Sequence, residues 1–461
     1  MRMLTLWLCA VICLPLAGQS YRVDTLKWTG SGDNRINIVI LGDGYRAEEM
    51  DQFAVDAVEF VEALFAEPPF LSYHEYFNVL LVETPSRESG ASHPGTATDV
   101  EEPYHPVSEV DNFYGSTFDY LGIHRLLAIP DTRALVQVVA TTVPDYDKLF
   151  MLVNSPYYGG SGFAVPVASL ARQSKEISLH EIGHSFAGLL DEYYAGNKYA
   201  REGINMSKWS NPEKVGWKEW VGKGDVGVFQ HCCGGISASW YRPHEECKMR
   251  YLGRPFCVVC REAIVQNVFA LVSPVDTYDP RELTQLDPPD GKVFRVGTVR
   301  PIPNTLDVIW QLNGATIASG TDSVVLTSSN LKSGQNTLQV TVSDVTDFLS
   351  PGMLRQTNQA TIAWQIDAST VSVSPAARAD VNLTLLPNPV ATELRVVYTS
   401  TSWDPTVARV HGSTGRLMLT KKIQPGEREV FIDVAGLAGG SYFLTLTSAS
   451  GVRVSMPFVK H

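Results

Sequence analysis

The chain has 461 residues, of which 44% are hydrophobic and 19% charged, and its formal net charge is −12 at pH 7. This length exceeds what one hydrophobic core usually supports, so we expect several domains, and the composition excludes a mostly disordered chain. The acidic balance, without a strong basic cluster, argues against nucleic acid or an anionic membrane surface as a partner.

The N-terminal stretch MRMLTLWLCAVICLPLAG has the pattern of a signal peptide at residues 1–18. Arg2 gives it a positive start, and the apolar run at 4–17 is too short for a comfortable membrane span. We predict cleavage near Gly18. Because no later stretch approaches the length of a transmembrane helix, we predict an exported mature chain without a transmembrane segment.

The cysteines of the mature chain lie close together in the sequence. Two of the seven cysteines fall in the predicted signal peptide, which leaves Cys232, Cys233, Cys247, Cys257 and Cys260. In an exported protein such clustering favours disulfides, with one thiol left over from the odd count. The CxxC spacing of Cys257 and Cys260 would also suit a structural zinc site.

The segment up to about residue 170 has the pattern of an α/β sheet. INIVILG at 36–42 is a buried strand, a helix follows at 46–66, and YFNVLLVET at 76–84 is the next strand. Pro166 cannot donate to a central ladder, so we expect the strand at 163–170 to lie at an edge. The other predicted elements are a surface excursion at 86–117, a helix at 131–141 and a strand at 149–154.

Asp43 follows the first strand in the turn GDGY. Aspartate is a preferred helix N-cap, so we expect its carboxylate to cap the helix at 46–66. The alternative is that Asp43 binds a structural cation.

The stretch SLHEIGHSFAGLLDEY at 178–193 carries the chemistry. His180 and His184 are four residues apart, so on a helix both imidazoles point to one face and can bind one metal ion. Glu181 lies beside them, where it could take a proton from a metal-bound water. Two neutral imidazoles and an oxygen ligand suit Zn²⁺ with an open fourth position.

The third metal ligand is less certain from the pattern alone. Gly188 can end the helix with a positive φ and turn the chain back, so residues after it could reach the metal. We predict Asp191, whose short carboxylate follows that turn, as the third ligand. Glu192, His231 and His244 remain alternatives.

From about residue 275 onward, the predicted strands are short and alternate polar with apolar residues. Turn signals every eight to twelve residues suggest an immunoglobulin-like β-sandwich at 276–375, and a second small β unit follows at 381–461. The stretch STVSVSPAARAD at 369–380 is a predicted linker. The strands expected in the sandwich are TLDVIWQLNG, DSVVLTS, NTLQVTVSD and ATIAWQID.

The metal-binding pattern resembles that of metzincin-type zinc peptidases, in which a third ligand follows a glycine turn after HExxH. It departs from HExxHxxGxxH, because the glycine and the acid each come one residue later and the acid replaces histidine. INIVILGDGY, HEIGHSFAGLLDEY and CKMRYLGRPFCVVC together resemble the IgA-peptidase-like metallopeptidases over about residues 30–272. The resemblance implies that Met249 forms a methionine turn below the zinc and that Tyr251 steadies the oxyanion. It also raises the possibility that a disulfide of Cys247 fixes that loop.

The last eighty or so residues resemble the C-terminal sorting domain of type IX secretion. The resemblance rests on LPNP at 386–389, VARVHGSTGRLMLTKKI, FIDVAGLAGGSYFLTLTS and the basic end MPFVKH. It implies passage through the periplasm and outer membrane of a Gram-negative bacterium, with secretion or attachment to the cell surface, and contact with the secretion machinery.

The sequence therefore predicts a multidomain, secreted zinc endopeptidase that is a monomer and acts on extracellular proteins or peptides, for example those of a host. Its substrate would lie along the edge strand near 163–170. The alternatives are a surface adhesin with an inactive peptidase fold, against which an intact Glu181 argues, and a zinc hydrolase of non-peptide amides or esters. The expected organisation is a signal peptide at 1–18, a metzincin-like α/β catalytic domain at 19–275, the β-sandwich at 276–375 and the all-β sorting domain at 381–461.

Overall fold

The computed structural model describes most of the chain after the predicted signal peptide. Contacts divide the chain into two compact units, the first comprising 1–283, 293–325 and 337–364 and the second 284–292, 326–336 and 365–461. The signal peptide predicted at 1–18 and the linker predicted at 369–380 lie outside the described residues. The residues that the structure describes are 21–163, 165–194, 200–232, 234–286, 291–353, 358–368, 382–400, 404–412, 416–448 and 453–461.

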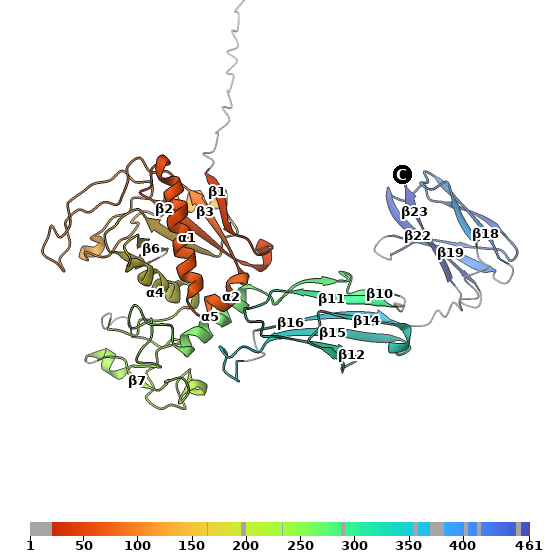
Figure 1. Ribbon diagram of the computed structural model, residues 1–461. Coiled ribbons are helices and arrows are strands. Elements are labelled where there is room, and N and C mark those ends of the chain that lie inside the picture. Colours follow the sequence, from red (N-terminus) through yellow and green to blue (C-terminus); the bar gives the residue numbers. More distant parts are fainter. Residues whose placement is uncertain are drawn as a thin grey trace, which may run out of the picture. The chain divides into compact units, whose positions relative to one another are not determined.

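A six-stranded sheet forms the centre of the α/β region (Figure 1). Its strands are Arg22–Lys27 (β1), Ile36–Asp43 (β2), Phe77–Glu83 (β3), Lys148–Val153 (β4), Gly160–Gly162 (β5) and Pro166–Ser169 (β6). They lie in the order β1-β3-β2-β4-β6-β5. The inner pairs β2–β3, β2–β4 and β4–β6 are parallel, whereas β1 and β5 at the two edges run antiparallel to their neighbours.

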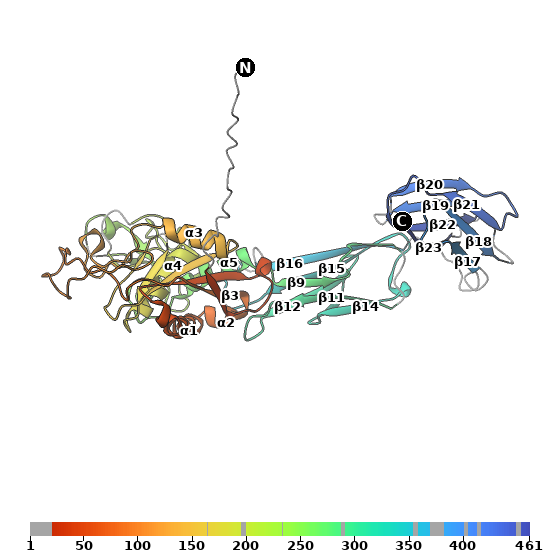
Figure 2. The ribbon, with the colours of Figure 1, turned by 90° about the horizontal axis from the view of Figure 1, so that it is seen from above.

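Successive side chains of these strands point to opposite faces of the sheet, and the strands are apolar on both faces. Helices therefore cover both faces. The helices are Met50–Ala66 (α1), Phe70–Tyr73 (α2), Arg133–Thr142 (α3), Ser174–Ala187 (α4) and Val258–Leu271 (α5). Ile38 and Ile40 of β2 belong to the core that also contains α1, α4 and α5. Val39 and Leu41 belong to the opposite core with α3, and Figure 2 shows α1 and α3 on the two sides of the sheet.

The predicted strand and helix order is confirmed for this region, with one correction. We expected the strand near 163–170 at the edge of the sheet, but β6 pairs with β4 on one side and with β5 on the other. The edge strand is β5. Pro166 is accommodated because it is the first residue of β6, opposite Gly162.

The expected helix cap at Asp43 is also wrong. The Asp43 carboxylate is fully buried and accepts hydrogen bonds from the backbone N–H groups of Tyr114 and Ser116, at 2.9 and 3.0 Å. It also accepts a longer one, of 3.4 Å, from the Ser86 hydroxyl. Asp43 therefore holds the long excursion between β3 and α3 against the sheet. The sequence pattern could not show this, because the partners lie about seventy residues away.

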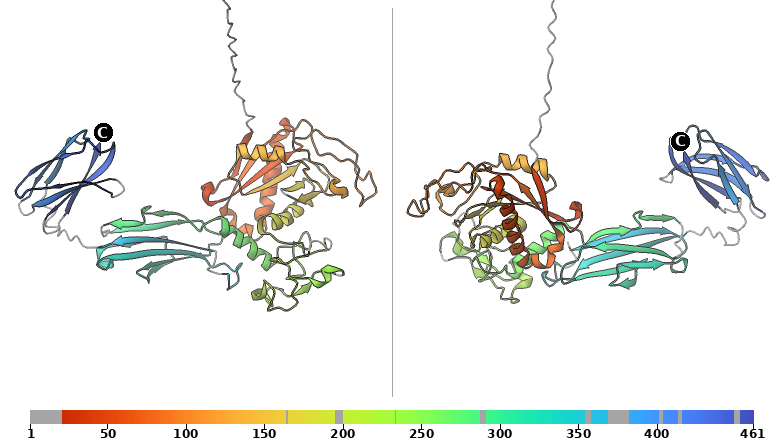
Figure 3. Two further views of the ribbon diagram at one scale, coloured as in Figure 1. Left: turned by 180° about the vertical axis from the view of Figure 1, so that it is seen from behind. Right: turned by 45° about the horizontal axis from the view of Figure 1, so that its top comes forward.

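The strands after α5 form two all-β sheets, coloured green to cyan in Figure 3. Their strands are Val275–Asp279 (β9), Thr284–Leu286 (β10), Lys292–Thr298 (β11), Leu306–Leu312 (β12), Ala315–Ser319 (β13), Ser323–Leu326 (β14), Gln335–Asp344 (β15) and Gln359–Asp367 (β16). One sheet has the order β10-β16-β15-β12-β13 and the other β14-β11-β9. The buried rings of Trp310 and Trp364 stack with centroids 5.8 Å apart.

Buried polar contacts join these strands to the α/β region within the first unit. The Tyr73 hydroxyl donates to the Asp344 carboxylate at 2.6 Å, and the Tyr76 hydroxyl donates to the Val299 carbonyl at 2.6 Å. The Arg35 guanidinium pairs with Asp276 at 2.9 Å. The α/β region therefore shares well-satisfied buried contacts with the strands that follow it.

The C-terminal part of the second unit is all-β. Its strands are Asn382–Leu386 (β17), Glu393–Thr399 (β18), Pro405–Gly412 (β19), Leu417–Lys422 (β20), Glu429–Asp433 (β21), Gly440–Ser448 (β22) and Arg453–Lys460 (β23). They form the sheets β17-β18-β21 and β20-β19-β22-β23 around one apolar core. Among the described residues, no helix has the length and apolar character needed to cross a membrane.

The role of Asp43 can be tested by Asp43→Ala. The change leaves two buried N–H groups without their acceptor, so we expect the free energy of unfolding to fall by about 1–3 kcal/mol. Urea denaturation followed by intrinsic fluorescence measures the difference. Asp347→Ala, at an exposed aspartate, is the matched control. Equal stability of the two variants would contradict this role.

Candidate metal centre and active site

Helix α4 carries both histidines and ends as the sequence predicts. Gly188 has φ 64° and ψ 23°, and its N–H bonds to the carbonyls of Gly183 and His184. The N–H of Leu189 also returns to the Gly183 carbonyl at 3.1 Å. This left-handed C-terminal turn reverses the chain and brings Asp191 back over the helix.

Three candidate ligand atoms form a nearly equilateral triangle. The Nε2 atoms of His180 and His184 are 3.1 Å apart. Asp191 Oδ1 lies 3.0 Å from His180 Nε2 and 3.1 Å from His184 Nε2. The structure thus brings together the two histidines and the acid that the sequence singled out.

The other nitrogen of each imidazole is held by a backbone carbonyl. His180 Nδ1 lies 3.0 Å from the Lys248 carbonyl, and His184 Nδ1 lies 2.6 Å from the Leu189 carbonyl. A carbonyl can only accept, so both Nδ1 atoms carry the proton and both Nε2 lone pairs of the neutral rings face the triangle. This tautomer is the one in which histidine binds metals, with the outer hydrogen bond fixing the ring.

The electrostatics of this triangle fit a bound cation. Burial raises the pKa of Asp191, but its close contacts with His180 and His184 outweigh burial and hold that pKa well below its usual range. Burial lowers the pKa of His184, but Asp191 reverses the shift and raises it. Two neutral imidazoles and a carboxylate are a donor set that zinc favours, and zinc–ligand bonds of about 2.0–2.1 Å give tetrahedral edges of roughly 3.3 Å.

Glu181 lies beside the triangle, against β5. A Cβ atom added to Gly162 would come within 1.7 Å of Glu181 Oε2, so the carboxylate sits directly over the backbone of that glycine. Burial raises the pKa of Glu181, against the opposing influence of His180 and His184. A carboxylate with a raised pKa is suited to accept and release a proton near neutral pH.

The alternative third ligands have other contacts. His231 Nε2 lies 2.9 Å from the Asp191 backbone carbonyl, and its Nδ1 contacts the Ser237 hydroxyl. His244 Nδ1 accepts the N–H of Glu246 at 2.9 Å. Glu192 is fully buried and accepts from Asn205 at 2.9 Å. Only Asp191 among these candidates falls in the same ligand-atom group as His180 and His184, within the described part of the chain.

Met249 lies against helix α4 and is fully buried. A Cβ atom at Gly183 would lie 2.6 Å from Met249 Sδ, so this glycine permits the close approach. The Met249 carbonyl accepts the N–H of Glu192 at 2.8 Å. The methionine therefore packs beneath the turn that carries both histidines.

A tyrosine that the sequence analysis overlooked, Tyr193, lies near the histidines, whereas the oxyanion role of Tyr251 stays a prediction. Tyr251 is 45% exposed, and the Arg250 guanidinium lies 4.6 Å from its ring centroid. Tyr193 has its ring centroid 6.0 Å from that of His180. Burial, followed by Asp191 and Glu181, raises the pKa of Tyr193, which keeps its hydroxyl protonated. The sequence signal that could have found Tyr193 is its position directly after Asp191 and Glu192.

A second group of possible ligands lies in the excursion between β3 and α3. Asp119 Oδ1 lies 3.3 Å from His93 Nε2 and 3.2 Å from His124 Nδ1, and Glu102 lies 3.3 Å from His124. A cavity of about 430 Å³ adjoins it, lined in part by His124 and Arg125. Arg125 also acts electrostatically on Glu181, so this excursion forms part of the surroundings of the site.

We expected disulfides among the five clustered cysteines without assigning their pairing, and the structure shows none at Cys247, Cys257 or Cys260. The three thiols are free and buried. Cys260 Sγ lies 3.6 Å from both other sulfurs, far beyond the 2.03–2.05 Å of a disulfide bond. Cys233 lies outside the described residues.

Two parts of the chain match known protein families. Residues 25–227 match the family model described as IgA Peptidase M64, and residues 384–460 match the Secretion system C-terminal sorting domain. The first match includes the candidate metal ligands but ends before CKMRYLGRPFCVVC, which we expected it to include. No curated protein matches the chain.

Solved structures give only distant similarities. A Bacteroides ovatus mixed-linkage glucan utilization protein, SGBP-B, has 12% identity and a TM-score of 0.17 over 41% of this chain and 45% of its own. Fibronectin(III)-like modules of Clostridium thermocellum CbhA have 9% identity and a TM-score of 0.17 over 40% of this chain and 92% of theirs. Latent PorU of Porphyromonas gingivalis has 15% identity and a TM-score of 0.15 over 40% of this chain and 20% of its own. The chain thus spans less than half of the first of these proteins.

The two family matches therefore carry the assignment. The sorting domain directs the protein to secretion or the cell surface by type IX secretion. The chain therefore carries a domain of the IgA peptidase M64 family, a family of metallopeptidases, at residues 25–227 and a type IX secretion sorting domain at 384–460.

Proposed function

We propose that this protein is a secreted, metzincin-like zinc endopeptidase whose metal is held by His180, His184 and Asp191. The observation that carries the proposal is the triangle of Nε2, Nε2 and Oδ1 atoms with edges of 3.0–3.1 Å. Both Nδ1–H groups donate to backbone carbonyls, so the two Nε2 atoms and Asp191 Oδ1 that face one another are all acceptors. A divalent cation is the simplest species that satisfies them together. Substrates would be extracellular proteins or peptides.

The residues around this triangle can divide the work of peptide hydrolysis. A zinc ion held by His180, His184 and Asp191 would supply Lewis acidity and would make a nearby water easier to deprotonate. Glu181 accepts a proton from the attacking water and then donates it to the leaving amine, as its raised pKa favours. The Tyr193 hydroxyl, kept protonated, donates a hydrogen bond to the developing oxyanion.

The edge strand β5 gives an extended peptide a place to bind. Gly160 is bridged by Leu126, whereas Gly162 at the other end of β5 is exposed and adjoins the Glu181 carboxylate. A substrate strand added at this end would present its scissile bond to Glu181. We therefore propose that the substrate binds at β5 instead of at the strand expected near 163–170.

The central prediction concerns Glu181→Gln. The change keeps the size of the side chain but removes its base, so we expect proteolysis to fall by about 10²–10⁴-fold with zinc content unchanged. Casein cleavage and metal analysis measure the two quantities. Glu62→Gln, at an exposed glutamate of α1, is the control and should retain full activity.

Two further conditions complete this test. Treatment of the wild type with a chelator should abolish cleavage, and added zinc should restore it. Undiminished cleavage by Glu181→Gln or in the chelator would refute the mechanism. Cleavage of an ester or non-peptide amide, without any cleavage of casein, would instead support a non-peptide hydrolase.

A second prediction concerns the contact between β5 and the base. Gly162→Ala places a Cβ where the Glu181 carboxylate lies, so the carboxylate must move. A displacement of about 1 Å can cost roughly 10²-fold in kcat, and we expect a loss of this order with bound zinc retained. Gly216→Ala is the control, because an added Cβ there meets nothing within 4 Å. A Gly162→Ala enzyme with the wild-type kcat would exclude the proposed position of Glu181.

A further inference from the structure

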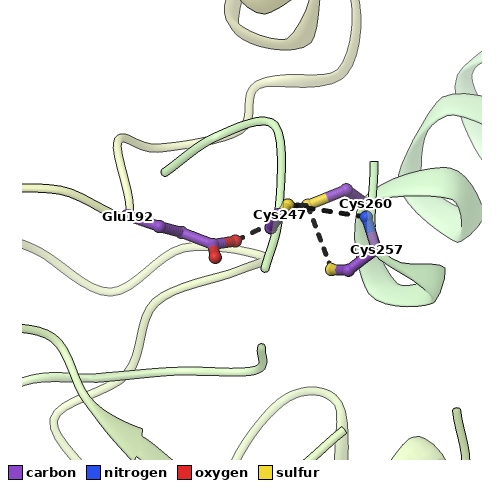
Figure 4. Close-up of side chains that lie close together, drawn as sticks. All are labelled: Glu192, Cys247, Cys257 and Cys260. Atoms are coloured by element: carbon purple, nitrogen blue, oxygen red, sulfur yellow. Dashed lines mark hydrogen bonds between the residues drawn. The ribbon is translucent and has the colours of Figure 1, made fainter. Parts of the chain in front are cut away.

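Four buried side chains from three separate segments converge away from the histidine triangle. They are Glu192 after the turn at Gly188, Cys247 two residues before Met249, and Cys257 and Cys260 at the start of α5 (Figure 4). Cys247, Cys260 and Glu192 are fully buried, and Cys257 is 6% exposed. Their ligand atoms all lie within 4.8 Å of one another.

The sulfur positions fit a shared metal ion better than a disulfide. Cys260 Sγ is 3.6 Å from Cys247 Sγ and 3.6 Å from Cys257 Sγ. In a tetrahedral zinc site with Zn–S bonds of about 2.3 Å, neighbouring sulfurs are roughly 3.7 Å apart. A disulfide between any two of the three would leave the third thiol alone beside a buried carboxylate.

The buried carboxylate of Glu192 is a second observation, independent of the cysteine spacing, that points to a bound metal. Its Oε1 accepts from Asn205 Nδ2 at 2.9 Å and lies 3.7 Å from Cys260 Sγ, and Figure 4 shows the carboxylate directed at the cysteines. Its Oε2 is buried and has no hydrogen-bond partner. A buried carboxylate with an unsatisfied oxygen is costly unless it is protonated or bound to a cation.

We propose that Cys247, Cys257, Cys260 and Glu192 bind a second, structural zinc ion. Three sulfurs and one carboxylate oxygen complete a tetrahedral set, so this site has no open position for substrate or water. Its place in the chain gives it a function. The bound zinc would link the segment after Gly188 and the loop that contains Met249 to the start of α5.

The two fastened segments are the ones that support the catalytic triangle. Glu192 directly follows Asp191, and its N–H donates to the Met249 carbonyl at 2.8 Å. Cys247 directly precedes Lys248, whose carbonyl holds His180 at 3.0 Å. The second zinc is therefore a positioning element for the catalytic ligands. Its existence does not depend on the proposed function of the first site.

The experiment compares the zinc bound by full-length wild type with that of three variants, by metal analysis and zinc K-edge X-ray absorption. We expect wild type to show sulfur ligands at about 2.3 Å. Cys257→Ser/Cys260→Ser should lose one zinc per chain and the sulfur shell. Cys232→Ser, at a cysteine outside the group, should retain both, and His184→Ala should lose a zinc but keep the sulfur shell.

The wild type alone provides a test if the double variant fails to fold. Thiols of the denatured, non-reduced protein are labelled and located by mass spectrometry. We expect Cys247, Cys257 and Cys260 all to be labelled, and labelling of the native protein to require a chelator. A disulfide between any two of these cysteines, or a zinc spectrum without sulfur ligands, would overturn the proposal, whatever the peptidase assay shows.

Discussion

Two imidazole nitrogens and a carboxylate oxygen face one another at 3.0–3.1 Å, and the rest of the α/β region is arranged around that contact. Three inward-facing acceptors repel one another unless a positive charge lies between them. The Nδ1–H groups of His180 and His184 donate to the backbone carbonyls of Lys248 and Leu189. In the neutral rings the Nε2 atoms therefore carry no proton. A bound cation would remove this repulsion, and the proposed mechanism needs that cation to have one open position.

The supporting structure can be followed outward from the triangle. The left-handed residue Gly188 reverses the chain and returns Asp191 to the helix. Gly183 allows Met249 to pack against the inner face of α4, and the loop of that methionine supplies the carbonyl for His180. The cysteine and glutamate group lies behind the same two segments. The sheet edge at Gly162 limits where the Glu181 carboxylate can lie.

The sequence predicted the elements, and it singled out the two histidines and the acid that the structure brings together at the candidate site, because these signals are local. The spacing of His180 and His184, the glycine at 188 and the acid after it all follow from helix geometry and chain reversal. Three features could not be read in this way. The edge position of β5 depends on pairing between distant strands, and the role of Asp43 depends on partners in a loop about seventy residues away. Glu192 meets the cysteines only once the chain is folded, so cysteine spacing in an exported protein suggested disulfides instead.

Anomalous diffraction at the zinc absorption edge, from crystals of the full-length protein, tests the central claim most directly. The account predicts an anomalous peak within about 2.0–2.2 Å of His180 Nε2, His184 Nε2 and an Asp191 carboxylate oxygen. A protein grown with zinc that shows no peak there, or a peak with Glu192, His231 or His244 in place of Asp191, would contradict it.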